Sequence, residues 1–284
     1  MIRVRYVMHF SCGAASAVAA KLMVAEWRSG ITQRIGAPGI RTTEMTEEEW
    51  GPDILIVNAF IQEEHADNRR FLDDVALWLG VAGIPFPIKV LRDEKYDAST
   101  LQVFRKRRFM KNRFMAPCSH HLKREVLAKI AKPGDITCLG YTAEETDRAE
   151  RLEDLFPKEK FRFPLIEQGL KKADCLALVE RAGIELPEMY KLGYANANCI
   201  GCVKGGEGYW NKIRRDFPEQ FIQIAEIQKE IGPGAYLFRD RKTGDRYSLY
   251  DLPPNKGRYL EEPEISCGFL CAMAEEEMAK GDAT

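Results

Sequence analysis

The chain has 284 residues, of which 45% are hydrophobic and 30% are charged, and its formal net charge at pH 7 is −1. This is the composition of a globular protein, and the near-zero net charge gives no global field that would attract nucleic acid or an anionic membrane. No apolar run reaches the roughly 18 to 20 residues of a membrane span. The first ten residues lack the apolar core and cleavage site of a signal peptide. We therefore expect a cytoplasmic protein with no membrane partner.

Strand and helix patterns alternate through the first half of the chain. Apolar runs typical of buried strands alternate with amphipathic segments, in which Gly30 is expected to end the first helix and Asp67 to cap the second. The expected elements are strands over 3–10, 53–60, 85–91 and 135–141, and helices over 16–30, 67–83 and 120–134. This order predicts an α/β fold, a doubly wound and mostly parallel sheet with helices on both faces.

The pattern changes after Phe163. A helix is expected over 171–184, then a loop region rich in glycine and asparagine over 186–210, then a helical segment interrupted near Pro218. The remaining residues show weak periodicity. We therefore predict a nucleotide-binding α/β domain over 1–162 and a C-terminal helical region over 163–284 that carries metal- or cluster-binding cysteines.

Six small residues, Ser11 to Ser16, stand between the first strand and the first helix. A turn of this kind exposes backbone N–H groups at the positive end of a helix, where phosphate is the usual ligand. The alternative is a tight connection without a ligand. A Walker loop is excluded, because no Gly-Lys-Ser/Thr follows.

Eight cysteines are present, and disulfides are unexpected in a reducing compartment. Cys138 and Cys175 lie in apolar patterns and are expected in the core. Two pairs, Cys199 with Cys202 and Cys267 with Cys271, have spacings that predict a four-thiolate site for Zn²⁺ or an iron–sulfur cluster. Unligated thiols and a redox-active dithiol are the alternatives. Cys118, beside a proline and polar residues, is a fifth candidate ligand.

Basic residues are dense between positions 105 and 124. They form either a solvated helix face or a patch for phosphate or nucleic acid. Among the histidines, His65, His120 and His121 are candidate site residues, whereas His9 lies within a strand and is expected in the core.

Four segments resemble the superfamily of PP-loop ATP pyrophosphatases and PAPS reductases, the adenine nucleotide alpha-hydrolase-like proteins. SCGAAS resembles its Ser-Gly-Gly-x-x-Ser loop, and LGYTAEETDRAERL its later Gly-x-Arg-x-x-Glu-Ser-x-x-Arg segment. PCSHHLKREVL resembles the Cys-Cys-x-x-Arg-Lys segment of sulfonucleotide reductases. NCIGCVKGGEGYWNKIRRDFPEQF resembles a segment of PAPS-reductase-like proteins that are often encoded by phages and mobile elements. The resemblance implies an adenine nucleotide, ATP or PAPS, bound by Ser11, Cys12, Gly13, Ala14, Ser16, His65, Lys123, Gly140 and Arg148.

The resemblance also implies roles for the cysteines. By similarity to cluster-bearing adenylylsulfate reductases, Cys118, Cys199 and Cys202 would be ligands of a 4Fe-4S cluster. The segment SCGFL resembles the Glu-Cys-Gly tail of those enzymes, so Cys267 would be the catalytic nucleophile and Cys271 the fourth ligand. The competing assignment joins the two pairs and leaves Cys118 free.

The loop departs from the family at Ala15, where pyrophosphatases usually carry an aspartate. The loop therefore lacks a carboxylate for Mg²⁺, which favours sulfonucleotide reduction with thiols over ATP cleavage. The basic segment favours ATP-dependent thiolation of a nucleic acid instead, and either chemistry implies a protein that donates sulfur or electrons. A third reading is a non-catalytic, zinc-bound module that senses a nucleotide.

Overall fold

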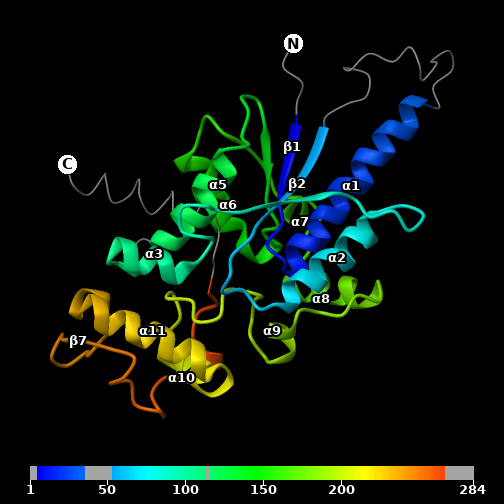
Figure 1. Ribbon diagram of the computed structural model, residues 1–284. Helices are drawn as coiled ribbons and strands as arrows, with labels where there is room; N and C mark the ends of the chain where they lie inside the picture. The colour runs from blue at the N-terminus through cyan, green and yellow to red at the C-terminus, as the bar shows by residue number, and fades with distance from the viewer. Residues whose placement is uncertain (1–4, 36–52, 113–115, 266–284) are drawn as a thin grey trace. The chain divides into compact units, whose positions relative to one another are not determined.

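The structure is a computed structural model that describes residues 5–35, 53–112 and 116–265 (Figure 1). Five strands form a sheet in the order β3–β2–β1–β4–β5, and every neighbouring pair is parallel. The strands are β1 (Arg5–His9), β2 (Asp53–Ala59), β3 (Ile88–Leu91), β4 (Ile136–Cys138) and β5 (Lys160–Arg162). The predicted α/β class with a parallel sheet is confirmed.

The strand order places the candidate turn at the middle of the sheet. β1 is the central strand, and its Val7 is paired with Leu55 of β2 and with Thr137 of β4. The side chain of Met8 is fully buried, as the apolar pattern of this strand predicts. Because parallel neighbours end at the same edge of a sheet, the loops that follow β1 and β4 lie side by side there.

Helix α1 (Ala14–Ile35) follows β1 and packs against α2 (Asp67–Leu79), α7 (Pro164–Glu167) and α8 (Lys172–Arg181). Its buried face carries Ala17, Ala19 and Ala20, each with no exposed surface. Alanines at these positions let the neighbouring elements approach closely, and the resulting core includes Phe71 of α2 and Val179 of α8.

Two expected helix signals are wrong. Gly30 does not end α1, which continues to Ile35; a glycine inside a helix costs only about 1 kcal/mol relative to alanine, and the helix tolerates it. Asp67 does not cap α2, since it is the first helical residue and no side chain caps this end. Its carboxylate instead accepts hydrogen bonds from Arg70 and from the backbone N–H of Glu188. These hydrogen bonds, of which the one from Arg70 has the largest effect, hold the pKa of the Asp67 carboxyl below its usual value.

The described chain divides into two compact units, which are discontinuous in sequence. The first unit contains the sheet and comprises 1–59, 66–91 and 130–191; it also includes η3 (Ala143–Glu145), α6 (Thr146–Leu155) and α9 (Glu188–Lys191). The second unit comprises 60–65, 92–129 and 192–284. The boundary predicted between 162 and 163 stays a prediction about folding domains. No helix in the described ranges is long and apolar enough to cross a membrane.

The second unit is mostly helical. Its main elements are α3 (Thr100–Arg107), α4 (Pro117–Ser119), the π-helical turn η2 (His120–Arg124), α5 (Glu125–Ala128), α10 (Glu207–Asp216), α11 (Pro218–Ile231) and a hairpin of β6 (Phe238–Arg239) and β7 (Arg246–Tyr247). The predicted interruption near Pro218 is confirmed, because α10 ends at Asp216 and α11 begins at the proline. The fully buried Trp210 contacts Phe221 across this break.

Candidate functional site

The turn between β1 and α1 is held by hydrogen bonds among its own small residues. The Ser16 hydroxyl donates to the carbonyl of Gly13 over 2.9 Å and accepts the backbone N–H of Ser11 over 3.2 Å. Ala14 donates its N–H to the hydroxyl of Tyr190 over 3.4 Å. Cys12 adopts a left-handed backbone with φ of 56°, which is rare outside glycine. The predicted residues therefore form a tight loop at the start of α1, with one helix N–H already meeting a hydroxyl oxygen.

Gly140, predicted from the family segment, packs directly on this turn. A Cβ atom at this position would lie 2.8 Å from the Cα atom of Ser16 and 3.0 Å from its nitrogen. Side chains essentially never approach a backbone this closely, so only glycine fits between β4 and the start of α1. The structure thus brings together Gly140 and the Ser11–Ser16 turn.

Arg69 adds a cation that sequence reasoning missed. Its guanidinium lies 3.1 Å from Oδ1 of Asn58 and 3.8 Å from Sγ of Cys12. Asn58, which is 1% exposed, in turn donates to the carbonyl of Phe10 over 2.9 Å. A positive charge beside the N-terminus of α1 strengthens the attraction of this turn for an anion. In the sequence Arg69 is one of two adjacent arginines on a helix, a pattern typical of a solvated face.

Arg148 lies in the same unit, on α6. Its guanidinium donates to Glu145 over 2.5 Å and stacks on the ring of Tyr141 at 4.1 Å. Glu145 also accepts the N–H of Thr142 in a capping box that fixes the loop after β4. These contacts order the loop that contains Gly140, and the predicted grip of Arg148 on a phosphate stays a prediction.

Three predicted metal ligands line one cavity in the second unit. Cys118 comes from α4, and Cys199 and Cys202 come from the loop before α10. The other lining residues are mainly apolar, with two lysines: Ile61, Thr100, Phe104, Ala116, Ser119, Lys123, Gly201, Val203 and Lys204. Cys118 and Cys199 also pack on the cluster of Ile61, Tyr96, Val103 and Leu122. Segments far apart in the sequence thus bring three thiols and a predicted lysine together.

Buried Tyr209 fixes the Cys-x-x-Cys turn. Its hydroxyl accepts the backbone N–H groups of Gly201 and Cys202 over 3.1 and 2.9 Å, and it donates to the carbonyl of Cys199 over 3.3 Å. Gly201 supplies the positive φ of 76° that this turn needs. Burial raises the pKa of Tyr209 well above its usual value, so the hydroxyl stays protonated.

Replacing Tyr209 with phenylalanine should leave two buried N–H groups without this acceptor. We expect a loss of about 1–3 kcal/mol in the free energy of unfolding, measured in urea. Metal affinity should also fall about tenfold, as for other residues that orient ligands. The control is Tyr250→Phe, since Tyr250 is 50% exposed and its hydroxyl bonds Glu226 at the surface. Equal losses of stability and of metal affinity in the two variants would show that Tyr209 does not support the metal site.

Two lysines, Lys123 and Lys204, line this cavity. Lys123 lies 3.9 Å from Glu64 in a largely buried ion pair. Burial holds the pKa of Lys111 below its usual value, and the neighbouring Cys202 offsets part of this effect.

Within the basic segment, Arg105 pairs with Glu230 and Arg108 donates to the Glu230 carbonyl. These bonds suit a packed helix face, and recognition of nucleic acid by 105–124 stays a prediction.

The other predicted residues are placed as follows. The ring of His65 packs edge-on against Phe217 at 6.1 Å in the second unit. Cys267 and Cys271 lie outside the described residues. Among the described residues, one set of three potential metal ligands has all its donor atoms within 4.8 Å of one another. It consists of His120, His121 and Glu125, so the three thiols around the cavity do not form such a set.

Comparison of the chain with protein-family models, with curated proteins and with solved structures finds no match. Function is therefore inferred from the residues of the two candidate sites.

Proposed function

We propose that this chain is a PAPS-reductase-like enzyme, with a doubly wound sheet that binds an adenine nucleotide at the Ser11–Ser16 turn and a C-terminal region that holds a thiolate-bound cofactor. The observation that carries the proposal is the meeting of Cys118, Cys199 and Cys202 at one cavity. This is the ligand set that the family resemblance implies. The small-residue turn, packed against Gly140 and neighboured by Arg69, supports the nucleotide part of the proposal.

The spacing of the three thiols favours an iron–sulfur cluster over a single zinc ion. Thiolates around one ion must converge on a point, whereas ligands of a cluster surround a volume filled by iron and sulfide. The three thiols line a cavity and are not all within 4.8 Å of one another. The cavity wall is mainly apolar, and the dry surroundings and nearby lysines would help to set the potential of a cluster. Cys271 would supply the fourth thiolate.

When bound, the cluster would supply electron transfer. The chain's own residues would do the rest. Lys123, paired with Glu64, and Lys204, which also lines the cavity, would attract an anionic sulfate or sulfur group. The Cys267 thiolate would attack the sulfur of the sulfonucleotide, forming a bond from its Sγ to that sulfur while the sulfur–oxygen bond to the nucleotide phosphate breaks and the nucleotide leaves. The electron-donor protein would then reduce the resulting Cys267 thiosulfonate and release sulfite. Tyr209 would keep the Cys199–Cys202 turn in place.

The second candidate function is ATP-dependent thiolation of a nucleic acid, favoured by the basic residues of 105–124. The nucleotide preference separates the two. Calorimetry on anaerobically purified full-length protein, with PAPS, adenylylsulfate and ATP in turn, should give saturable binding of at least one. A sulfonucleotide preference supports reduction, and an ATP preference supports thiolation. Absence of binding by all three would contradict the nucleotide part. A colourless protein with bound zinc would support the non-catalytic module instead.

A further inference from the structure

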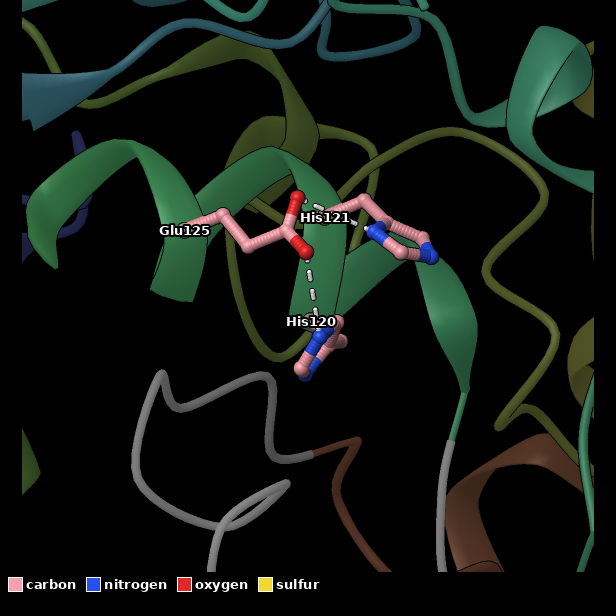
Figure 2. Close-up of side chains that lie close together, drawn as sticks. All are labelled: His120, His121 and Glu125. Carbon is pink, nitrogen blue, oxygen red and sulfur yellow. Dashed lines mark ion pairs between the residues drawn. The ribbon is translucent and has the colours of Figure 1, made fainter. Parts of the chain in front are cut away.

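Two histidines and a glutamate converge at the start of α5 (Figure 2). Nε2 of His120 lies 3.2 Å from one carboxylate oxygen of Glu125, and Nδ1 of His121 lies 3.1 Å from the other. The His121 side chain is only 9% exposed, whereas that of Glu125 is 41% exposed. The group is therefore anchored on its protein side and open on its carboxylate side.

The local backbone explains why consecutive histidines can share one carboxylate. In an α-helix, residues four apart lie on one face, so Glu125 would meet His121 but turn away from His120. Here the N–H of Glu125 donates to the carbonyl of His120, which is the five-residue spacing of a π-helix. The extra residue in this turn brings His120 to the same side. π-Helical turns are rare and occur frequently at functional sites.

The donor atoms and their spacing suit a metal ion. Bonds of about 2.0–2.2 Å from a metal to imidazole nitrogen and carboxylate oxygen place neighbouring ligand atoms about 3 Å apart. The two nitrogen–oxygen distances, 3.2 and 3.1 Å, match this separation of neighbouring ligand atoms. Two imidazoles and one carboxylate are a ligand set of zinc and of non-haem iron, and three protein ligands leave a position for water or substrate. The ring of Tyr96, 5.0 Å from that of His121, restricts the orientation of the imidazole.

We propose that His120, His121 and Glu125 form a mononuclear site for a divalent cation, zinc or ferrous iron, separate in ligand chemistry from the cysteine cavity. The site goes beyond the proposed nucleotide and cluster functions and does not depend on them. The alternative is an ion pair between the histidines and the carboxylate that binds no metal.

Cobalt distinguishes this site from the cysteines. Full-length protein, treated with a mild chelator that leaves the cysteine-bound cofactor in place, is titrated with Co²⁺ and followed by difference spectroscopy. We expect one equivalent to bind with weak visible bands and without the intense near-ultraviolet charge-transfer band of thiolate ligands. Adding Glu125→Gln should weaken this binding at least tenfold, whereas adding Glu150→Gln, an exposed change on α6, should not alter it. Unchanged binding in the Glu125→Gln protein, or spectra with thiolate bands alone, would overturn the site.

A second measurement needs no change at the ligands. The chain contains four histidines, His9, His65, His120 and His121, so their ring nitrogens can be followed individually by NMR. In the same chelator-treated full-length protein, one equivalent of Zn²⁺ should shift the ring nitrogens of His120 and His121 and leave those of His9 and His65 in place. Failure of both adjacent histidines to shift would leave only the ion pair.

Discussion

Replacing Cys199 or Cys202 with serine is expected to remove the bound metal and destabilise the second unit. Both thiols line the cavity and belong to the ligand set under either assignment of the cysteines. Because a bound cofactor stabilises only the folded state, its loss costs about 4 kcal/mol when the free ligand exceeds its Kd a thousandfold. Metal analysis and urea unfolding of anaerobically prepared proteins measure the two effects.

The buried thiols provide matched controls. Cys138 and Cys175 have no exposed surface and belong to the core of the first unit. Burial raises the pKa of each thiol to about 12, so neither is available as a thiolate. Cys138→Ser and Cys175→Ser should keep full metal content. Full metal content in Cys199→Ser and Cys202→Ser as well would contradict the site.

Cys118, Cys267 and Cys271 decide how the site is completed. If Cys267→Ser keeps the metal but abolishes turnover, Cys267 is the nucleophile and the reductase-like assignment gains. If, of these three serine variants, only Cys118→Ser keeps the metal, the two cysteine pairs form the site and attack from Cys267 is excluded.

Replacing Gly140 with alanine is expected to reduce nucleotide affinity by roughly tenfold or more, the effect of losing one hydrogen bond of about 1.5–3 kcal/mol to a charged phosphate. The added Cβ atom would lie 2.8 Å from Cα of Ser16, so the start of α1 must move. Overpacking of this kind also costs about 1–3 kcal/mol of stability. By comparison, Gly13→Val would meet the hydroxyl of Tyr190, at 3.2 Å from the Cβ position, a side-chain end that can shift.

Gly30→Ala is the matched control, since Gly30 lies in the same helix α1 with nothing within 4 Å of a Cβ atom. It should stabilise the protein by about 0.5–1 kcal/mol and leave nucleotide affinity unchanged. Calorimetry measures nucleotide affinity and thermal unfolding measures stability in the unsubstituted, Gly140→Ala and Gly30→Ala proteins. If a folded Gly140→Ala protein binds nucleotide with unchanged affinity, the β1–α1 turn does not bind the nucleotide.

Much of the sheet could be predicted because buried parallel strands are continuous apolar runs. The strand predicted over 53–60 is found as β2 (Asp53–Ala59), whereas only three residues of the strand predicted over 135–141 form β4 (Ile136–Cys138). β5 was not predicted, since its Lys-Phe-Arg sequence is partly exposed and carries no such run. The helix expected over 120–134 begins with the π-helical turn η2, continues as α5 and ends at Ala128. The apolar pattern gives no sign of the inserted residue in η2.

The sites were predicted where a residue type has a restricted chemistry. Glycine at 140 and cysteines at 118, 199 and 202 carry such signals, and the structure brings them to the turn and to the cavity respectively. Arg69 and Tyr209 were missed, since an arginine on a helix and a tyrosine beside a tryptophan are typical of any surface or core. Their roles arise from long-range contacts, with Cys12 and with the Cys-x-x-Cys turn.

The central claim is that the thiols of Cys118, Cys199 and Cys202 hold an iron–sulfur cluster. The most direct measurement is iron and acid-labile sulfide analysis, with a visible absorption spectrum, on full-length protein purified without oxygen or chelator. We expect a brown protein that contains iron and sulfide in equal amounts and loses both in Cys199→Ser. A colourless protein without iron or sulfide under these conditions would contradict the claim.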